Sequence, residues 1–268
     1  MKNRPITIIT ITRGRPSLLR RAIKSVKDQI FNGEIQHLII VDACTRTQDF
    51  LVKNFKRSPQ LEWILFERGS QDVSGPNRLA RLRNIAVHSS KYEMIAFLDD
   101  DNVFECNHLS SLAYLARDTG IPAVYSYRQL LYANGEPFLE HRSPWRRDIK
   151  ASRERYKELC KVGVFKLGSN IMYDRADSLK HPNPIRTVDT NEWLFNGSLL
   201  LHLPFVESYT HNDWVENNTE DKKLVQQIIR QEIPTSCTQL PTLKYYLGGY
   251  SNTFEACDPE HRWISPTT

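Results

Sequence analysis

Two kinds of apolar pattern alternate along the first half of the chain. Short runs of consecutive apolar or β-branched residues predict strands covered on both faces, and segments with apolar residues every three or four positions predict helices. The predicted strands cover residues 5–11, 38–42, 61–66 and 94–98. The predicted helices cover residues 18–26, 48–55, 76–88 and 107–117. This alternation predicts an α/β fold with a mostly parallel, Rossmann-like central sheet flanked by helices and joined by right-handed crossovers.

The regular alternation ends near Tyr127, and the second half carries separate signals. Asn134-Gly135 lies between apolar runs and predicts a hairpin over 130–139. Thr219 starts a predicted helix that Pro234 ends. Further apolar segments cover 162–172 and 194–201.

Length and composition point to one globular domain. The chain has 268 residues, of which 40% are hydrophobic and 25% charged, as in ordinary soluble proteins. We expect one continuous domain with two halves, residues 1–127 and 128–268. No apolar stretch approaches the ~20 residues that span a bilayer, and the first residues lead into a strand without an apolar signal segment. We therefore expect a cytoplasmic protein without an integral membrane segment.

The charge and the cysteines exclude some classes of function. A formal charge of +5 suits anionic substrates without requiring nucleic acid. The five cysteines are an odd number without closely spaced pairs. They therefore predict neither a zinc site nor a disulfide framework.

Three consecutive acids, Asp99, Asp100 and Asp101, follow the apolar run 94–98. Adjacent carboxylates repel one another unless a cation or hydrogen-bond donors offset the repulsion. Alternate side chains of an extended segment point the same way, so Asp99 and Asp101 can face one divalent ion while Asp100 points elsewhere or caps the turn. Taken alone, the motif is explained equally well by a solvated acidic turn.

Other polar residues lie at the same edge of the predicted sheet. The loop from Thr10 to Arg15 follows the first strand, and Asp42 ends the second. In open α/β sheets, ligands bind outside the carboxyl ends of the strands. We therefore expect these residues and the three acids to share one crevice.

Six segments together resemble family two glycosyltransferases, which have the GT-A fold. They lie at residues 6–13, 19–26, 39–42, 80–84, 97–102 and 219–224. The resemblance is strong from Ile6 to about Leu112 and patchier from Gly168 to Ile229. It implies transfer of a sugar from a nucleoside-diphosphate donor, with UDP-sugars favoured, to a hydroxyl acceptor, with inversion and with Mn²⁺ or Mg²⁺. It also implies that the first half binds the donor and that the second half binds the acceptor and carries the catalytic residue.

The resemblance assigns donor roles residue by residue. Asp42 would accept a hydrogen bond from the pyrimidine ring, although residues 43–47 depart from the D-G-S-T-D continuation of the family. Arg83 would hold a phosphate oxygen or fix the geometry of the acids, whereas Arg78 and Arg81 are expected to be solvated helix charges. The further expected donor contacts are Thr10, Arg13, Asp99 and Asp100. The expected metal ligands are Asp101 and Asp99.

An inverting transfer needs a base for the proton of the acceptor hydroxyl. By resemblance this base is Asp221, with Asp189 and Asp213 as alternatives. Glu220 is well explained as a first-turn acid that complements the helix dipole. The weaker candidates for acceptor contacts are Trp214, Trp193 and Glu220. Both tryptophans could equally pack in the core.

A basic segment from Arg142 to Lys161 contains eight lysines and arginines. Such a segment is usually a solvated helix face, and we favour that interpretation. The alternative is peripheral contact with a membrane or an anionic acceptor.

Other classes of protein fit the sequence less well. Residues 97–103 also match the D-x-D-x-V pattern of aspartate-nucleophile phosphatases, but those enzymes carry it on their opening strand. A sugar nucleotidyltransferase would need a glycine-rich loop after the first strand, where this chain has only Gly14. A catalytically inactive nucleotide-sugar-binding protein is the remaining alternative.

Overall fold

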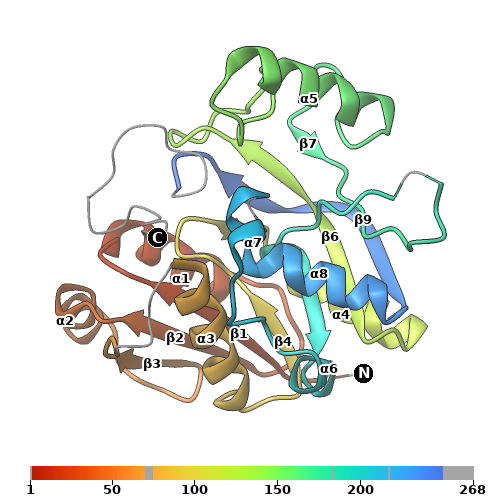
Figure 1. Cartoon of the computed structure of the whole chain (residues 1–268). Helices are drawn as coiled ribbons and strands as arrows, with labels where there is room; N and C mark the ends of the chain where they lie inside the picture. The colour runs from red at the N-terminus through yellow and green to blue at the C-terminus, as the bar shows by residue number, and fades with distance from the viewer. Residues whose placement is uncertain (1, 70–74, 183, 217, 250–268) are drawn as a thin grey trace.

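The computed structural model describes residues 2–69, 75–182, 184–216 and 218–249, except for the side chains of residues 214 and 215 (Figure 1). Four parallel strands form the first half of the sheet, in the order β3-β2-β1-β4. They are β1 (Ile6–Thr12), β2 (Ile35–Asp42), β3 (Leu61–Phe66) and β4 (Met94–Phe97). The helices that connect them are α1 (Pro16–Lys27), α2 (Thr45–Asn54) and α3 (Gly75–His88). The predicted parallel α/β arrangement is confirmed.

The second half of the chain extends the same sheet, which continues in the order β4-β8-β6-β9-β5. These strands are β5 (Val103–Phe104), β6 (Ala123–Leu131), β8 (Trp193–Asn196) and β9 (Thr235–Tyr246), and β7 (Ile171–Met172) pairs with β6. β8 runs antiparallel to both β4 and β6, whereas β9 runs parallel to β6. The 127/128 division falls inside β6, so it does not coincide with any break in the sheet.

Helices cover both faces of the sheet because its strands are apolar at successive positions. Ile6 and Ile8 pack towards α1 and α4 (His108–Thr119), whereas Ile9 packs on the opposite face. That opposite face is covered by α3, α6 (Gly197–His202) and α8 (Glu220–Arg230). In Figure 1, α3 and α8 lie in front of the sheet. The apolar faces of these helices place the first turn of α8 beside the end of β4.

The remaining elements lie around the second half of the sheet. They are a short 3₁₀ helix η1 (Thr190–Glu192), α5 (Ile149–Lys161) and α7 (His211–Val215). The predicted hairpin turn is present, since Tyr132 N donates to Glu136 O and Gly135 has a φ of 91°. Its return segment makes a single bridge, between Pro137 and Leu131, rather than a full strand. Among the described residues, no helix is long and apolar enough to cross a membrane.

Candidate active site

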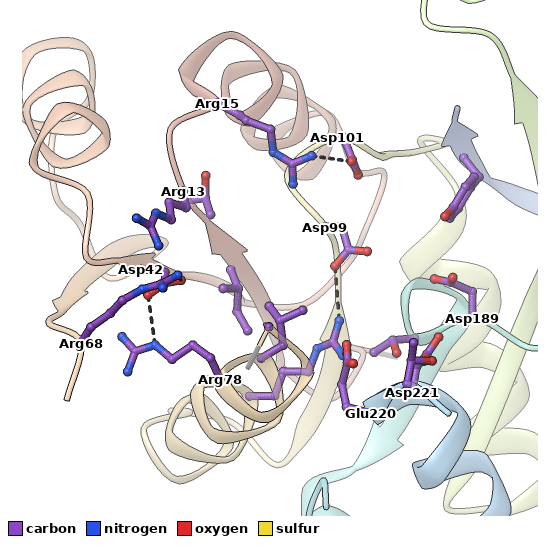
Figure 2. A pocket seen from close by; sticks show the side chains of 18 residues that line it. Arg13, Arg15, Asp42, Arg68, Arg78, Asp99, Asp101, Asp189, Glu220 and Asp221 are labelled. Carbon is purple, nitrogen blue, oxygen red and sulfur yellow. Dashed lines mark hydrogen bonds and ion pairs between the residues drawn. The ribbon is translucent and has the colours of Figure 1, made fainter. Parts of the chain in front are cut away.

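A cleft opens at the carboxyl ends of β1, β2 and β4, where the sequence places most of its polar candidates. The loop after β1, the first turn of α8, η1 and β9 complete its walls. Its charged lining residues are Arg13, Arg15, Asp42, Arg68, Arg78, Arg83, Asp99, Asp101, Asp189, Glu220 and Asp221 (Figure 2). The cleft therefore brings together acids and arginines from segments more than 200 residues apart.

Asp42 forms the end of the cleft away from the D-x-D motif, and two arginines hold it. Arg78 Nε lies 3.0 Å from Asp42 Oδ1, and Arg68 contacts Oδ2 at 3.4 Å (Figure 2). The expectation that Arg78 is a solvated charge is wrong. Its side chain is buried, and it also donates to the carbonyl oxygens of Phe66 and Glu67, so it ties α3 to the end of β3. Arg81 is partly buried and does not line the cleft.

Thr10 does not reach the cleft. Its side chain is fully buried, and its hydroxyl lies 2.9 Å from His37 Nε2 on the neighbouring strand. Strand alternation turns Thr10 into the sheet interior, whereas Arg13, past the end of β1, lines the cleft. We therefore withdraw Thr10 as a donor contact.

The three acids of the motif point in two directions. Asp99 and Asp101 both line the cleft, whereas Asp100 is fully buried and does not. Thr12 Oγ1 donates to Asp100 Oδ2 at 2.6 Å, and Arg15 pairs with the other carboxylate oxygen. Asp100 is thus a positioning residue for the loop after β1 rather than a donor contact, which corrects its assignment.

Arg83 links α3 to both the motif and α8. It is 5% exposed, and its guanidinium lies 2.5 Å from Glu220 Oε1 and 3.5 Å from Asp99 Oδ1. Glu220 is itself buried, and this burial raises its pKa to about 7, against the opposing effect of Arg83. The helix dipole therefore does not account for Glu220. Its carboxylate holds Arg83 against Asp99.

Two of the three candidate bases line the cleft. Asp221 accepts hydrogen bonds from Thr219 Oγ1 and from Lys222 N, the latter at 2.8 Å. Asp189 faces the same space from the start of η1. Asp213 is outside the cleft lining, where it pairs with Lys223 at 2.8 Å. Of the three candidate bases, Asp221 and Asp189 thus line the cleft, and Asp213 does not.

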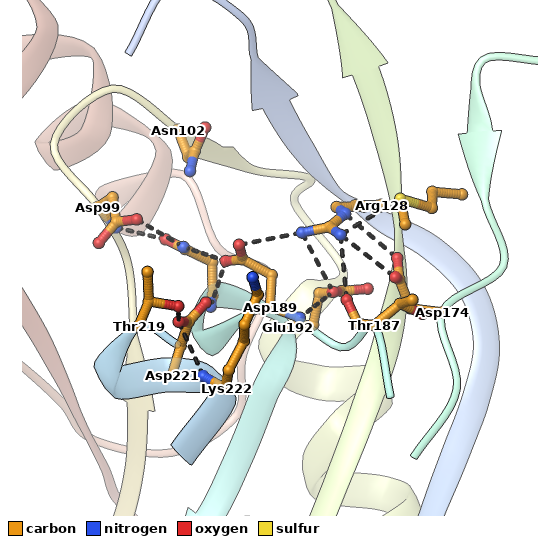
Figure 3. A network of polar contacts seen from close by, with 12 residues as sticks. Asp99, Asn102, Arg128, Asp174, Thr187, Asp189, Glu192, Thr219, Asp221 and Lys222 are labelled. Carbon is orange, nitrogen blue, oxygen red and sulfur yellow. Dashed lines mark hydrogen bonds and ion pairs between the residues drawn. The ribbon is translucent and has the colours of Figure 1, made fainter. Parts of the chain in front are cut away.

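A polar network joins Asp99 to a buried arginine that the sequence analysis missed (Figure 3). Asn191 Nδ2 donates to Asp99 Oδ2 at 2.8 Å and to Asp189 Oδ1 at 2.5 Å. Asp189 Oδ2 lies 3.0 Å from Arg128, which is 4% exposed. Arg128 also pairs with Asp174 at 3.2 Å. Arg128 was detectable as the one charged residue in the apolar run 123–131, whereas nothing in the local sequence indicates the role of Asn191.

The two tryptophans named as candidates for acceptor contacts lie in different parts of the structure. Trp193 is 1% exposed and packs on Tyr125 and Phe195 with ring centroids 4.9 and 5.2 Å apart. It is a core residue on β8 and cannot stack on an acceptor sugar. Trp214 lies on α7, and its side chain falls outside the described residues. Tyr245 lines the cleft from β9, a strand that the sequence patterns did not predict.

Asp99 and Asp101 fit a hard divalent cation that is shared with a ligand. Both offer carboxylate oxygens to the cleft. Within the ranges that the structure describes, no group of three His, Cys, Asp or Glu side chains could hold a metal ion. Mg²⁺ and Mn²⁺ sites of nucleotide enzymes commonly use one or two carboxylates and leave the other positions to phosphate and water. Two acids are therefore sufficient for such a site.

Comparison with known proteins agrees with this geometry. The profile of glycosyl transferase family 2 matches residues 7–180. No curated protein matches the chain.

Three solved structures have the same fold. TarS 1–349 of S. aureus in complex with UDP has a TM-score of 0.59 and 14% identity, over 92% of this chain and 61% of that chain. The complex of TarS 1–349 with UDP-GlcNAc has a TM-score of 0.59 and 13% identity, over 97% of this chain and 63% of that chain. The mannosyltransferase PcManGT of Pyrobaculum calidifontis, in complex with GDP-Man and Mn²⁺, has a TM-score of 0.58 and 12% identity, over 94% of this chain and 59% of that chain. The chain thus spans about three-fifths of the length of these proteins, and the predicted GT-A fold is confirmed.

Proposed function

This chain belongs to glycosyl transferase family 2, and from that premise we propose that it transfers a sugar from a nucleoside-diphosphate donor to a hydroxyl acceptor, with inversion. The observation that carries the proposal is the convergence of Asp42, Asp99, Asp101 and Asp221 on one cleft. Solved structures of the same fold contain UDP, UDP-GlcNAc or GDP-Man, the last with Mn²⁺. An aspartate-nucleophile phosphatase is disfavoured because the motif follows the fourth strand of the sheet rather than the first.

The donor would lie along the cleft from Asp42 to Asp101. Asp42, held by Arg68 and Arg78, would accept a hydrogen bond from the base, and UDP is the favoured nucleotide. Arg83 and Arg13 would meet the phosphates. Mn²⁺ or Mg²⁺ bound to Asp101 and Asp99 would act as a Lewis acid that neutralises the leaving diphosphate.

The acceptor would enter from the side of α8. Asp221 would take the proton of its hydroxyl as the sugar is transferred, which requires a carboxylate within hydrogen-bond reach of that hydroxyl. Thr219 and Lys222 N hold one oxygen of Asp221, so its other oxygen would be the one that faces the acceptor. Asp189 is the alternative base on the same wall.

We expect UDP to raise the melting temperature strongly when Mn²⁺ is present and weakly when a chelator is present. A ligand at a hundred times its dissociation constant adds about 2.7 kcal/mol to the free energy of unfolding. Thermal-shift measurements with UDP and GDP, each with and without Mn²⁺, would check this. Equal stabilisation with metal and with chelator would contradict the D-x-D assignment, whereas a preference for GDP would contradict only the role of Asp42.

The basic segment offers a site for an anionic acceptor or membrane. Arg146 and Arg147, just before α5, and Lys150, in its first turn, are exposed, as expected for a solvated face. Burial lowers the pKa of Lys222, beside Asp221, and the nearby charges of Arg146 and Arg155 lower it further. We propose that the positive charge of the basic segment attracts a phosphate-bearing acceptor or lipid surface.

Replacing Arg146, Arg147 and Lys150 together by Ser should weaken binding to phosphatidylglycerol vesicles by about a hundredfold, because each of the three basic side chains contributes about 1 kcal/mol near an anionic surface. Co-sedimentation measures the loss, and the thermal shift with UDP should stay the same.

The matched control replaces the exposed Lys27, Lys53 and Lys56, which lie on and after α1 and α2, by Ser. This variant removes the same charge from another surface, so it should retain vesicle binding. If both variants bind equally well, the basic segment is only a solvated helix face.

A further inference from the structure

Arg15 occupies the carboxylate that the metal would use. Its Nη1 donates to Asp101 Oδ2 at 2.8 Å, and its Nη2 contacts Oδ1 of Asp100. The side chains of Arg15 and Asp101 are 23% and 15% exposed, and both line the cleft (Figure 2). One guanidinium thus spans two of the three acids, and it neutralises the acid that is best placed to bind a cation.

Asp100 holds one end of this guanidinium firmly. The acid is fully buried, and Thr12 already donates to its Oδ2. A buried carboxylate that loses its cation is strongly destabilised. The contact between Arg15 and Asp100 is therefore expected to persist when a ligand enters the cleft.

The backbone of Asp101, in contrast, has an anchor other than Arg15. Arg21 donates to the carbonyl oxygen of Asp101 at 2.5 Å and stacks on the Tyr246 ring, 3.6 Å from its centroid. A Cβ at Gly249 would lie 2.5 Å from Asp101 Oδ2, so the glycine leaves room for the carboxylate. The backbone of Asp101 is thus anchored by Arg21, and Gly249 leaves space beside its carboxylate. Release of the carboxylate by Arg15 leaves this backbone anchor intact.

A metal and a diphosphate would change the partners available to Arg15. A divalent cation competes with the guanidinium for Asp101 Oδ2, because two cations on one carboxylate repel each other. A diphosphate offers oxygens that a guanidinium binds in pairs. Arg15 lies at the end of a short loop directly before α1. Its side chain has several rotatable bonds, which would let the guanidinium exchange one partner.

We propose that Arg15 couples metal binding to donor binding. Without metal and donor, the guanidinium of Arg15 pairs with the Asp101 carboxylate. When metal and donor enter, Nη2 stays on Asp100 and Nη1 moves from Asp101 to a phosphate oxygen of the donor. The proposal rests on the proposed function, since it requires a metal and a diphosphate in the cleft. Its consequence is that the protein binds the metal weakly until the nucleotide arrives.

Replacing Arg15 by Gln tests this coupling. The variant should bind Mn²⁺ about tenfold more tightly without nucleotide, because the competing cation is gone, and UDP should increase its Mn²⁺ affinity by a smaller factor than in the wild type. Electron paramagnetic resonance of free Mn²⁺, with and without UDP, measures both quantities without any transfer assay. The gain should disappear in the double variant Arg15→Gln, Asp101→Asn.

Two further variants make the result decisive. Arg20→Gln removes a charge from α1, where Arg20 contacts Asn54, and it should leave Mn²⁺ binding unchanged. If Arg15→Gln does not fold, Arg15→Lys replaces it in the test. The lysine keeps a cation for the buried Asp100 but cannot span both acids, so the gain in Mn²⁺ affinity should be smaller than tenfold. Mn²⁺ affinity that is unchanged or weaker in these Arg15 variants would overturn the coupling. If wild-type protein binds no Mn²⁺ even with UDP, the metal-dependent function itself is wrong.

Discussion

Replacing Asp221 by Asn is expected to lower the rate of sugar transfer by about a hundredfold or more, because an amide cannot take the acceptor's proton at neutral pH. The amide oxygen can still accept the hydrogen bonds of Thr219 and Lys222, so the start of α8 should keep its structure. Donor and metal binding should survive, since neither is assigned to Asp221. Single-turnover transfer rates and UDP titrations separate the two quantities.

Two variants calibrate this result. Asp101→Asn should weaken metal-dependent UDP binding, because a carboxylate ligand to a hard cation is lost. Asp213→Asn changes an acid that lies eight positions before Asp221 and pairs with Lys223 outside the cleft lining, so transfer should continue. If Asp221→Asn turns over at the wild-type rate, the base is elsewhere, and Asp189 is the acid to replace next.

The largest effect on stability is expected for Arg128→Met. Removing one partner from a buried ion pair costs about 3–5 kcal/mol of the free energy of unfolding, because the remaining charges stay buried without compensation. Arg128 faces Asp174, Asp189 and Glu192, at 3.2, 3.0 and 3.8 Å. Urea unfolding of the variant and the wild type measures the loss.

The control for this prediction is Arg142→Met. Arg142 pairs with Glu140 on the surface, and such pairs contribute only about 0–1 kcal/mol. Burial raises the pKa of Glu192 well above its usual value, so the folded protein favours the protonated form of this acid. The Arg128→Met variant should consequently lose further stability as the pH rises above the ordinary pKa of a glutamate, because the unfolded chain releases that proton more readily. Equal stability of the two variants would show that the buried network contributes little.

The parts of the fold that follow from local pattern were predicted well. The strands ending at Asp42 and before Asp99 are continuous apolar runs because helices cover both faces, and such runs are recognisable without knowledge of the partners. The strand β9 was missed, because its residues are mostly only half-buried and its pairing with β6 spans more than 100 residues. Local patterns cannot show such a pairing.

The errors at the site have the same origin. Arg78 and Glu220 look like solvent-facing helix charges in the sequence, yet their partners lie 36 and 137 positions away. Trp193 gives no sequence signal that would distinguish a sugar platform from core packing, and only its contact with Phe195 decides this. The motif itself was recognisable, but the inward direction of Asp100 depends on Thr12 and Arg15, which come from another strand and loop.

The strand order also has a consequence for how this protein is made. On the side away from β1, β4 pairs with β8, which begins nearly 100 residues later in the chain. β5 likewise pairs with β9, which is the last strand of the chain described. During synthesis, one edge of the apolar strand β4 therefore stays unpaired until most of the protein has left the ribosome. Pairing over such separations is slow, and open strand edges invite association with other chains. Folding of this chain should thus be late and cooperative, and the nascent chain is expected to bind chaperones until β8 and β9 have paired.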